Sequence, residues 1–143
     1  MIVQAIVLGA SQRAQIVTIA ERTYPEECCG LLVGHDAADG RIVVARIVES
    51  RNIRSDRARD RFEIDPQVRI TVERELRTSA ERVVGHYHSH PDHPARPSPT
   101  DLDMAFEPSL VWLIVGVADG RVGEINAFRV NEVLDEFEPV AIV

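Results

Sequence analysis

The stretch His88-Ser89-His90-Pro91, followed by Ser98-Pro99-Thr100-Asp101, carries most of the information about architecture and chemistry in this chain. Side chains two residues apart on an extended strand point to the same side, about 6–7 Å apart along the backbone. His88 and His90 can therefore offer two imidazoles to one metal ion, and Asp101 can add a carboxylate oxygen. Two histidines and one carboxylate leave a tetrahedral Zn²⁺ with one open position, which is typical of catalytic zinc. The pattern predicts one Zn²⁺ per chain with a catalytic water whose pKa falls to about 7.

The spacing of these residues resembles that of the JAMM (MPN-plus) metalloprotease family, which has a distant glutamate, then His-x-His-Pro, then Ser-x-x-Asp. In that family the serine lies eight residues after the second histidine, as Ser98 does here after His90. The glutamate lies three residues before a glycine that opens an apolar strand, and Glu27 has this offset from Gly30. The resemblance implies that Glu27 is the general base, which moves a proton from water to the leaving amine. It also implies that Ser98 steadies the oxyanion and that the zinc ligands are His88, His90 and Asp101.

Each of these residues also has a purely structural interpretation. The histidines could be polar residues at the end of a strand. Ser98 at the N-cap, with Pro99 at N1 and an acidic residue at N3, would stabilise a helix start without any catalysis. We expect both roles to hold, because the cap would aim Asp101 at the metal. Glu26 competes with Glu27 for the role of base, but only Glu27 has the offset to the glycine.

The remaining histidines and the two cysteines are expected to play lesser parts. His86 lies on the same strand face as the metal-binding histidines, and we expect it to pack or support rather than to ligate. His93, in a proline-rich loop, is expected to face solvent close enough for substrate contact, and His35 is expected to be exposed. Cys28 and Cys29 are adjacent, and vicinal cysteines rarely form a disulfide. They are expected to be small buried side chains, the alternative being an oxidisable thiol beside the glutamate.

A polar segment from residue 49 to residue 61 is expected to form a loop. Its residues 51–61 contain two aspartates, Asp56 and Asp60, and five arginines, giving a local net charge of +3 in an otherwise acidic chain. The segment is either a solvated loop or a patch that attracts an acidic partner by long-range steering. The corresponding segment in JAMM enzymes lies beside the substrate groove. The five arginines are Arg51, Arg54, Arg57, Arg59 and Arg61.

Composition limits the classes of function. A chain of 143 residues is long enough for one domain with a real core, and we expect a single domain over residues 1–143. The net charge of −7 argues against nucleic acid as the main partner. No apolar run approaches the roughly 20 residues that cross a bilayer, and the N-terminus does not resemble a signal peptide. These features predict no membrane partner and a cytoplasmic location, and they leave the oligomeric state open.

Hydrophobic periodicity and turn residues predict an α/β (α+β) fold. Helices are expected over residues 11–22, from an Asp65 N-cap and Pro66 to about residue 79, and from Ser98 onward. Hairpin turns are expected at residues 36–40 and 119–120. The expected strands cover residues 2–8, 31–33, 41–48, 82–87, 110–117, 122–130 and part of 133–142. Together these give a curved, mixed, mostly antiparallel sheet flanked by helices, and the JAMM resemblance implies an architecture related to that of cytidine deaminases.

The resemblance also implies a substrate. JAMM enzymes hydrolyse peptide or isopeptide bonds after the C-terminal tail of a ubiquitin-like protein, which usually ends in Gly-Gly. This compact chain looks most like the small bacterial members, which process β-grasp sulfur-carrier proteins of the ThiS/MoaD type. Those enzymes trim residues after Gly-Gly or free a cysteine built on the carrier. The alternatives are a general isopeptidase that removes such modifiers from target proteins, and a non-catalytic scaffold like the MPN-minus members, which have lost metal ligands.

Overall fold

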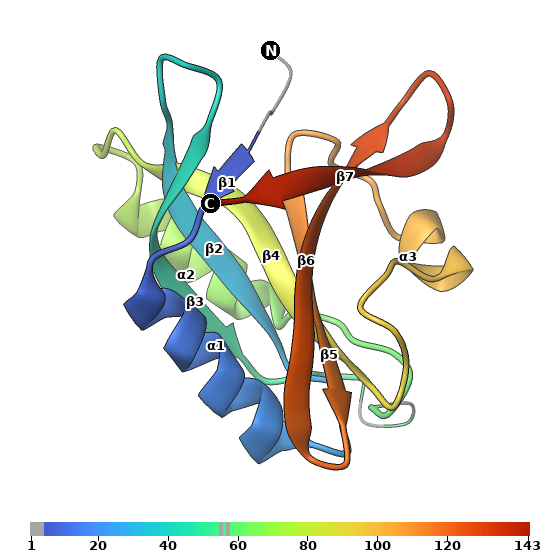
Figure 1. The fold of residues 1–143 in the computed structure, drawn as a ribbon. Coiled ribbons are helices and arrows are strands. Elements are labelled where there is room, and N and C mark those ends of the chain that lie inside the picture. The colour runs from blue at the N-terminus through green and yellow to red at the C-terminus, as the bar shows by residue number, and fades with distance from the viewer. Residues whose placement is uncertain (1–4, 55, 57) are drawn as a thin grey trace.

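Three helices are interspersed among seven strands in a computed structural model that describes residues 5–54, 56 and 58–143 (Figure 1). The described helices are α1 (Ala10–Thr23), α2 (Pro66–Glu75) and α3 (Pro99–Asp103). The described strands are β1 (Ala5–Val7), β2 (Cys29–Asp36), β3 (Ile42–Ser50), β4 (Arg82–Pro91), β5 (Val111–Ala118), β6 (Arg121–Asn131) and β7 (Glu136–Ile142). The prediction of a mixed α/β fold is confirmed.

The strands form one closed barrel in the order β1-β3-β2-β4-β5-β6-β7. Four neighbouring pairs are antiparallel, whereas β1 runs parallel to both β3 and β7, and β4 runs parallel to β5. The expectation of a mixed, mostly antiparallel sheet is confirmed, whereas the closure of that sheet into a barrel was not predicted. The sheet closes because Ile6 in β1 pairs with Ile42 on one side and Ile142 on the other. The likeness to cytidine deaminases stays a prediction.

Several boundaries differ from the expected ones for physical reasons. Strand β4 does not end before the histidines but continues to Pro91, because β5 pairs with it in parallel register as far as Pro91↔Val117. Helix α2 begins at Pro66 behind the Asp65 N-cap, as expected, but ends at Glu75 rather than near residue 79. The expected first strand is confirmed only over Ala5–Val7. Its residues 2–4 lie outside the described part of the chain.

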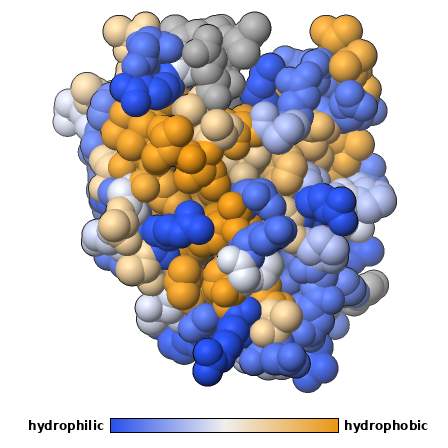
Figure 2. All heavy atoms as spheres, in the orientation of Figure 1, coloured by the Kyte–Doolittle hydropathy of each residue, from blue (hydrophilic) through white to orange (hydrophobic). Residues whose placement is uncertain are grey.

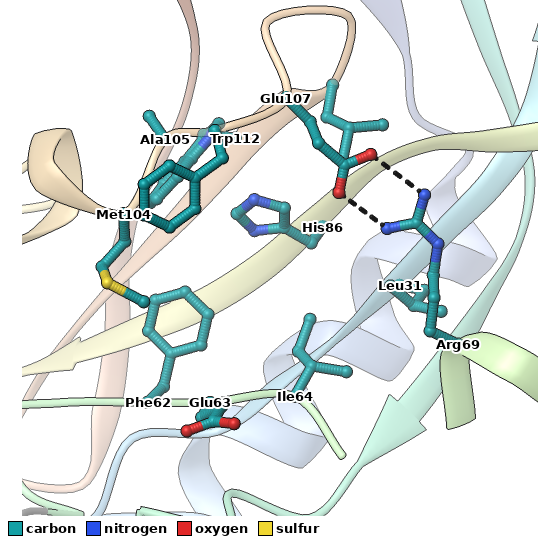
Figure 3. A pocket seen from close by; sticks show the side chains of 12 residues that line it. Leu31, Phe62, Glu63, Ile64, Arg69, His86, Met104, Ala105, Glu107 and Trp112 are labelled. Carbon is teal, nitrogen blue, oxygen red and sulfur yellow. Dashed lines mark hydrogen bonds and ion pairs between the residues drawn. The ribbon is translucent and has the colours of Figure 1, made fainter. Parts of the chain in front are cut away.

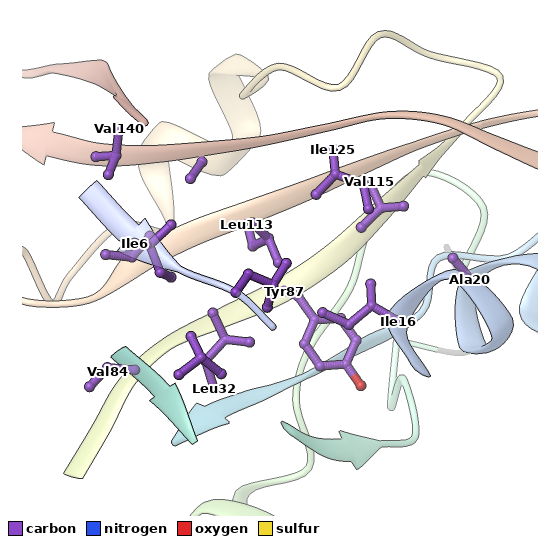
Figure 4. Close-up of a cluster of buried hydrophobic side chains, with 14 of the residues drawn as sticks. Ile6, Ile16, Ala20, Leu32, Val84, Tyr87, Leu113, Val115, Ile125 and Val140 are labelled. Carbon is purple, nitrogen blue, oxygen red and sulfur yellow. The ribbon is translucent and has the colours of Figure 1, made fainter. Parts of the chain in front are cut away.

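The main hydrophobic core lies between the barrel strands and helix α1. Ile16 and Ala20 of α1 are buried against barrel residues that include Tyr87, Leu113 and Val115 (Figure 4). A second, smaller cluster lies on the other side of β2 and β4, where α2 contributes Val72. Neighbouring residues of β4 therefore face different environments, with one face in the main core and the other toward α2 and α3.

In the view of Figure 2, an apolar area lies over the paired ends of β1 and β7 and continues down the middle of the molecule, with polar residues around it. A separate apolar area lies at the tip of the β6–β7 hairpin, where Val133 is 92% exposed. No helix in the described part of the chain is long and apolar enough to cross a membrane.

Candidate metal centre

Strand β4 presents its three histidines on the face that is turned away from the main core. Tyr87 alternates with them and is buried in that core, and Ser89 is also fully buried. His88 has no exposed surface, and His90 is 8% exposed. The period of two that the sequence predicted for these imidazoles is therefore confirmed.

The segment before β2 brings a carboxylate to the histidines. Glu27 is buried, whereas the competing Glu26 is exposed. The Glu27 N–H donates to the Ala58 carbonyl at 2.6 Å, and the next N–H, that of Cys28, donates to the Ser89 hydroxyl at 2.8 Å. These two bonds fix the backbone on both sides of the Glu27 side chain between the 51–65 loop and β4.

Position 30, three residues after Glu27, is a glycine because no larger residue fits at this point of β2. A Cβ at Gly30 would lie 2.4 Å from both the Tyr87 hydroxyl and the Val48 carbonyl oxygen. The glycine that the sequence pattern places three residues after Glu27 thus allows β2 to lie close against β3 and β4.

Helix α3 positions Asp101 through a capping box. The Ser98 hydroxyl accepts from the Asp101 N–H at 3.1 Å, and Asp101 Oδ2 accepts from the Ser98 N–H at 2.9 Å. Pro99 occupies the first helical turn. The expected cap at Ser98 is confirmed, and the same carboxylate that completes it also reaches the histidines. Its position therefore depends on the helix start, as the sequence suggested.

The donor atoms of three residues converge on one point. His88 Nε2 lies 3.1 Å from His90 Nε2, and Asp101 oxygens lie 3.2 Å from His90 Nε2 and 3.5 Å from His88 Nε2. Ligand atoms about 2.0–2.2 Å from a tetrahedral zinc ion would lie roughly 3.3–3.5 Å from one another. The donor set and its spacing therefore fit Zn²⁺. A second grouping combines Glu27 with His88 and His90, with ligand atoms within 4.8 Å of one another.

The ring of His90 is held in the orientation that a metal ligand requires. Its Nδ1 lies 2.9 Å from the Pro94 carbonyl oxygen, so this nitrogen carries the proton and donates. Nε2 is then the unprotonated nitrogen that faces Asp101 and His88. A backbone carbonyl that fixes the tautomer in this way is the usual outer partner of a metal-binding histidine.

The pKa values of the two carboxyl groups at the site shift in opposite directions. Burial raises the pKa of Glu27 to about 8, although the nearby His90 charge partly opposes this. Burial also acts on Asp101, but hydrogen bonds to His88 and His90 hold its pKa well below the usual range. Glu27 Oε1 is buried and has no hydrogen-bond partner among the described residues. The site thus combines an ionised Asp101 with a Glu27 that can hold a proton near neutral pH.

The pKa values of His88 and His90 also shift in opposite directions. Burial lowers the pKa of His88, because charging a fully enclosed imidazole is costly. Burial also opposes charging of His90, but the hydrogen bonds to Asp101 and the Pro94 carbonyl raise its pKa overall. Of the two imidazoles, His90 therefore holds a proton more strongly than His88.

One amide side chain ties the 51–65 loop to the glutamate. Asn52 Nδ2 donates to the Glu27 carbonyl at 3.3 Å and to the Arg61 carbonyl at 2.9 Å. Its Oδ1 accepts from the N–H groups of Arg54 and Glu63, each at 3.0 Å. Asn52 therefore uses both ends of its side chain to hold the loop against the segment that carries Glu27.

Two hollows flank the histidine row. A polar cleft of about 390 Å³ is bordered by Glu27, His90 and Ser98, among other residues. An apolar pocket of about 230 Å³ lies at the His86 end of the row, and Figure 3 shows His86 there between aromatic side chains and the Arg69–Glu107 ion pair. Phe62 lines this pocket and stacks on the His88 ring at 4.2 Å between ring centroids.

The other predicted residues have the following places. His86 contacts Trp112 in the apolar pocket and is not among the converging donors, so a packing role is favoured. Burial lowers its pKa to about 3. His93 is exposed and lines the polar cleft, and His35 is exposed, both as expected. The two cysteines are free and buried, as the structural interpretation predicted.

The arginine-rich loop is only partly a solvated segment. Arg51 pairs with Asp65 at 3.1 Å, and Arg54 pairs with Asp56 at 3.3 Å. Arg59 is exposed, whereas Arg61 lines the polar cleft. Arg57 lies outside the described residues. Arg61 therefore borders the candidate site, and the interpretation of the loop as a patch that attracts an acidic partner stays a prediction.

Sequence reasoning missed three residues that shape the site, namely Asn52, Phe62 and Trp112. The signal for Phe62 was present, because it is an isolated aromatic residue in a polar segment. The signal for Asn52 was weaker, since asparagine is common in loops. Trp112 was assigned only to a strand, and its contacts with the rings of His86 and His88 depend on the parallel pairing of β4 with β5.

Comparison with known proteins gives consistent matches along the chain. The profile of the prokaryotic homologs of the JAB domain matches residues 9–131. The chain is 29% identical to the CysO-cysteine peptidase of Mycobacterium tuberculosis over 141 residues, which cover 99% of this chain and 93% of that protein. It is 36% identical to the desampylase of Haloferax volcanii over 98 residues, covering 68% and 67% of the two chains. A solution structure of a protein from Desulfitobacterium hafniense superposes with a TM-score of 0.81 at 31% identity, covering 96% and 91%.

Proposed function

This chain belongs to the family of prokaryotic homologs of the JAB domain, and from that membership we propose that it is a zinc-dependent peptidase. Its substrate would be a ubiquitin-like sulfur-carrier protein, cut after the C-terminal Gly-Gly tail. The observation that carries the proposal is the convergence of His88, His90 and Asp101 donors within 3.5 Å beside the buried carboxyl group of Glu27. We further propose that residues 1–143 act as one domain.

His88, His90 and Asp101 would hold the metal ion. Their mutual distances and the low pKa of Asp101 favour this set over the one that contains Glu27, because a ligand carboxylate must be ionised. Bound zinc would supply Lewis-acid activation of water and of the scissile carbonyl group. The Pro94 carbonyl keeps His90 in the required tautomer, and the α3 capping box keeps Asp101 in place.

Glu27 would move the proton. A group with a pKa of about 8 can accept a proton from the attacking water and return it to the leaving nitrogen near neutral pH. Its unpartnered Oε1 is free to make that hydrogen bond to water. The carboxyl group would thus act first as base and then as acid, while Asp101 stays ionised throughout.

Ser98 would assist the scissile carbonyl oxygen. Its hydroxyl oxygen accepts from the Asp101 N–H, which leaves the hydroxyl proton available for donation into the cleft that Ser98 lines. A single well-placed donor of this kind contributes about 3 kcal/mol to stabilisation of an oxyanion in comparable sites.

The substrate proposal draws on two relatives and on chain geometry. The CysO-cysteine peptidase and the desampylase both carry names that refer to small protein substrates or their conjugates. A tail that ends in Gly-Gly suits a narrow groove, because an extended segment without side chains can lie close to the protein backbone. Hydrolysis also requires the scissile carbonyl carbon within about 3–3.5 Å of the attacking oxygen.

The test uses a β-grasp carrier that bears one residue after its Gly-Gly. We expect the zinc-loaded protein to cut at that junction, as measured by intact mass, and to act slowly on the same carrier with valines in place of the two glycines. Free peptides with the same tail should be poor substrates, since they lack the folded surface of the carrier. Equal rates on free peptides and on the folded carrier would favour a generic peptidase instead.

A second candidate is a general isopeptidase that removes such modifiers from lysine side chains of target proteins. The 36% identity to a desampylase favours it. A carrier joined to a lysine side chain through an isopeptide bond separates the two functions, because only the isopeptidase would cut it faster than the linear fusion. Retention of the complete donor set argues against a non-catalytic scaffold.

A further inference from the structure

We propose that Arg61 and Arg96 bind the free α-carboxylate of the residue that is released, so that the enzyme prefers carriers extended by a single amino acid. This inference rests on the proposed function and specifies its leaving group. Both side chains line the polar cleft that Glu27, His90 and Ser98 also line. A carboxylate that enters this cleft therefore lies beside the groups that would act on the scissile bond.

Arg61 and Arg96 are the two arginines that line the polar cleft, and within the described residues neither of them forms an ion pair with aspartate or glutamate. Eight others form ion pairs with aspartate or glutamate. The chain has 23 acidic against 16 basic residues, so carboxylates are in excess. Two guanidinium groups that remain available at one cleft are therefore suited to an incoming anion, which arginine binds with two parallel hydrogen bonds.

The backbone next to each arginine is held by the side chain of an asparagine. The Arg61 carbonyl accepts from the Asn52 amide, and that same amide donates to the Glu27 carbonyl. On the other side of the cleft, Asn126 Nδ2 donates to the carbonyl of buried Ala95 at 3.0 Å, directly before Arg96. Each arginine side chain thus extends from a held segment, which lowers the entropic cost of closing on a ligand.

A second anchor sits two residues before Arg96. The Pro94 carbonyl accepts from His90 Nδ1 at 2.9 Å, so the loop that carries Arg96 also orients the His90 ring. Pro97 follows Arg96 and restricts its backbone further. Recognition of the carboxylate and orientation of a metal-holding residue therefore share one short segment.

The acidic residues that line the cleft do not prevent it from binding an anion. Asp60 also lines the cleft, but it has an interaction of its own, and within the described residues it forms no ion pair with Arg61 or Arg96. Glu27 lies deeper, at 4% exposure. The exposed His93 adds a third group that can donate a hydrogen bond. The lining as a whole therefore offers more donors to an anion than acceptors that would repel it.

The opposite end of the histidine row has a different character. The pocket beyond His86 is lined mainly by apolar side chains, and its Arg69 is already paired with Glu107 in two hydrogen bonds (Figure 3). A free carboxylate has no available cation there. The two ends of the histidine row therefore differ in polarity, and the free carboxylate of the substrate fits the polar cleft rather than the apolar pocket.

The test compares two substrates that differ in one group, namely a carrier ending in Gly-Gly-Ala with a free carboxylate and the same carrier ending in a carboxamide. We expect the zinc-loaded protein to have a kcat/KM for the carboxylate that is about tenfold to a hundredfold higher, the range for charge-assisted hydrogen bonds. Arg61→Gln with Arg96→Gln should bring the ratio close to one. Arg59→Gln, in the same loop but outside the cleft lining, is the matched control and should leave the ratio unchanged. Long-range attraction to the carrier cancels in this ratio, because the carrier is the same.

A binding measurement gives a readout that does not depend on turnover. In the Glu27→Gln variant, the carboxylate substrate should bind more tightly than the carboxamide by a similar factor, and the double arginine substitution should remove the difference. Equal cleavage and equal binding of the two substrates would overturn the inference while the proposed function stands. Faster cleavage of an isopeptide-linked lysine, which has no nearby free carboxylate, would also overturn it. Failure to cut any carrier would overturn the proposed function, and the inference with it.

Discussion

Asn52 offers the sharpest test of how the loop and the candidate site depend on each other. Its side chain makes four hydrogen bonds, two as donor to the carbonyls of Glu27 and Arg61, and two as acceptor from the N–H groups of Arg54 and Glu63. Asn52→Ala removes all four. Asn52→Asp keeps the shape and the acceptor, but it replaces the donor by a carboxylate oxygen that faces two carbonyl oxygens.

The expected changes in stability and activity follow from these four hydrogen bonds. A hydrogen bond contributes a net ~0.5–1.5 kcal/mol, and because Asn52 is half-buried, water can replace part of what is lost. We expect Asn52→Ala to lower the free energy of unfolding by about 2–3 kcal/mol. Asn52→Asp should lower it by a similar amount, because the repulsion between oxygens offsets the two retained bonds. A shift of Glu27 by about 1 Å would reduce hydrolysis roughly a hundredfold.

Three measurements separate the effects of the Asn52 substitutions on stability, on Glu27 and on the hydrogen bonds that Asn52 accepts. Urea unfolding gives the stability change, and turnover of the carrier gives the effect on Glu27. Amide hydrogen exchange reports the acceptor side, since the N–H groups of Arg54 and Glu63 should stay protected in Asn52→Asp but not in Asn52→Ala. Metal content should be unchanged in both variants, because no donor of the candidate zinc site bonds to Asn52. Wild-type turnover and stability in Asn52→Ala would refute the reasoning.

Four further predictions concern the metal, the activity and the titration of Glu27, and the thiols. The purified protein should bind close to one equivalent of zinc by elemental analysis, and alanine should abolish most of it at each of the proposed ligands: His88, His90 and Asp101. Glu27→Gln should keep zinc but hydrolyse slowly, whereas exposed Glu26→Gln should stay near the wild-type rate. In protein from which metal has been removed by a chelator, the Glu27 carboxyl group keeps its proton up to about pH 8 in the folded state but loses it near pH 4.5 in the unfolded state. The free energy of unfolding should therefore fall by about 3–5 kcal/mol between these two pH values. Glu27→Gln should abolish this fall. Burial raises the pKa of Cys28 to about 11 and that of Cys29 to about 12, so neither thiol should react with an alkylating reagent at pH 8 until the protein is unfolded.

The local parts of the site could be predicted because each depends on a short stretch of chain. Alternation along one strand puts His88 and His90 on one face, and the cap at Ser98 fixes the start of α3. The offset between Glu27 and Gly30 came instead from the JAMM resemblance, and the structure explains the glycine by its contacts with Tyr87 and Val48 on neighbouring strands. The resemblance to the JAMM family, which rested on these motifs, is confirmed by the match to prokaryotic homologs of the JAB domain.

Closure of the sheet could not be predicted, because it depends on pairings between distant segments. Strand β1 has only three described residues, and its two parallel partners lie more than 30 residues away in sequence. Parallel neighbours have no connecting turn whose residues would reveal them, unlike the β5–β6 hairpin at Asp119 and Gly120, which was predicted. The extra length of β4 has the same origin in its parallel pairing with β5.

The contributions of Asn52, Arg61 and Arg96 show where the motif stops determining the site. The motif residues are held by local geometry, whereas these three act through the folding of two irregular segments onto the barrel. Such segments carry weak sequence signals, because a polar side chain in a loop is equally compatible with solvent. On the proposed function, the motif would account for the chemistry of hydrolysis and the two loop arginines for the choice of leaving group. Two chains with the same motif would then differ in substrate when the arginines of the cleft are replaced.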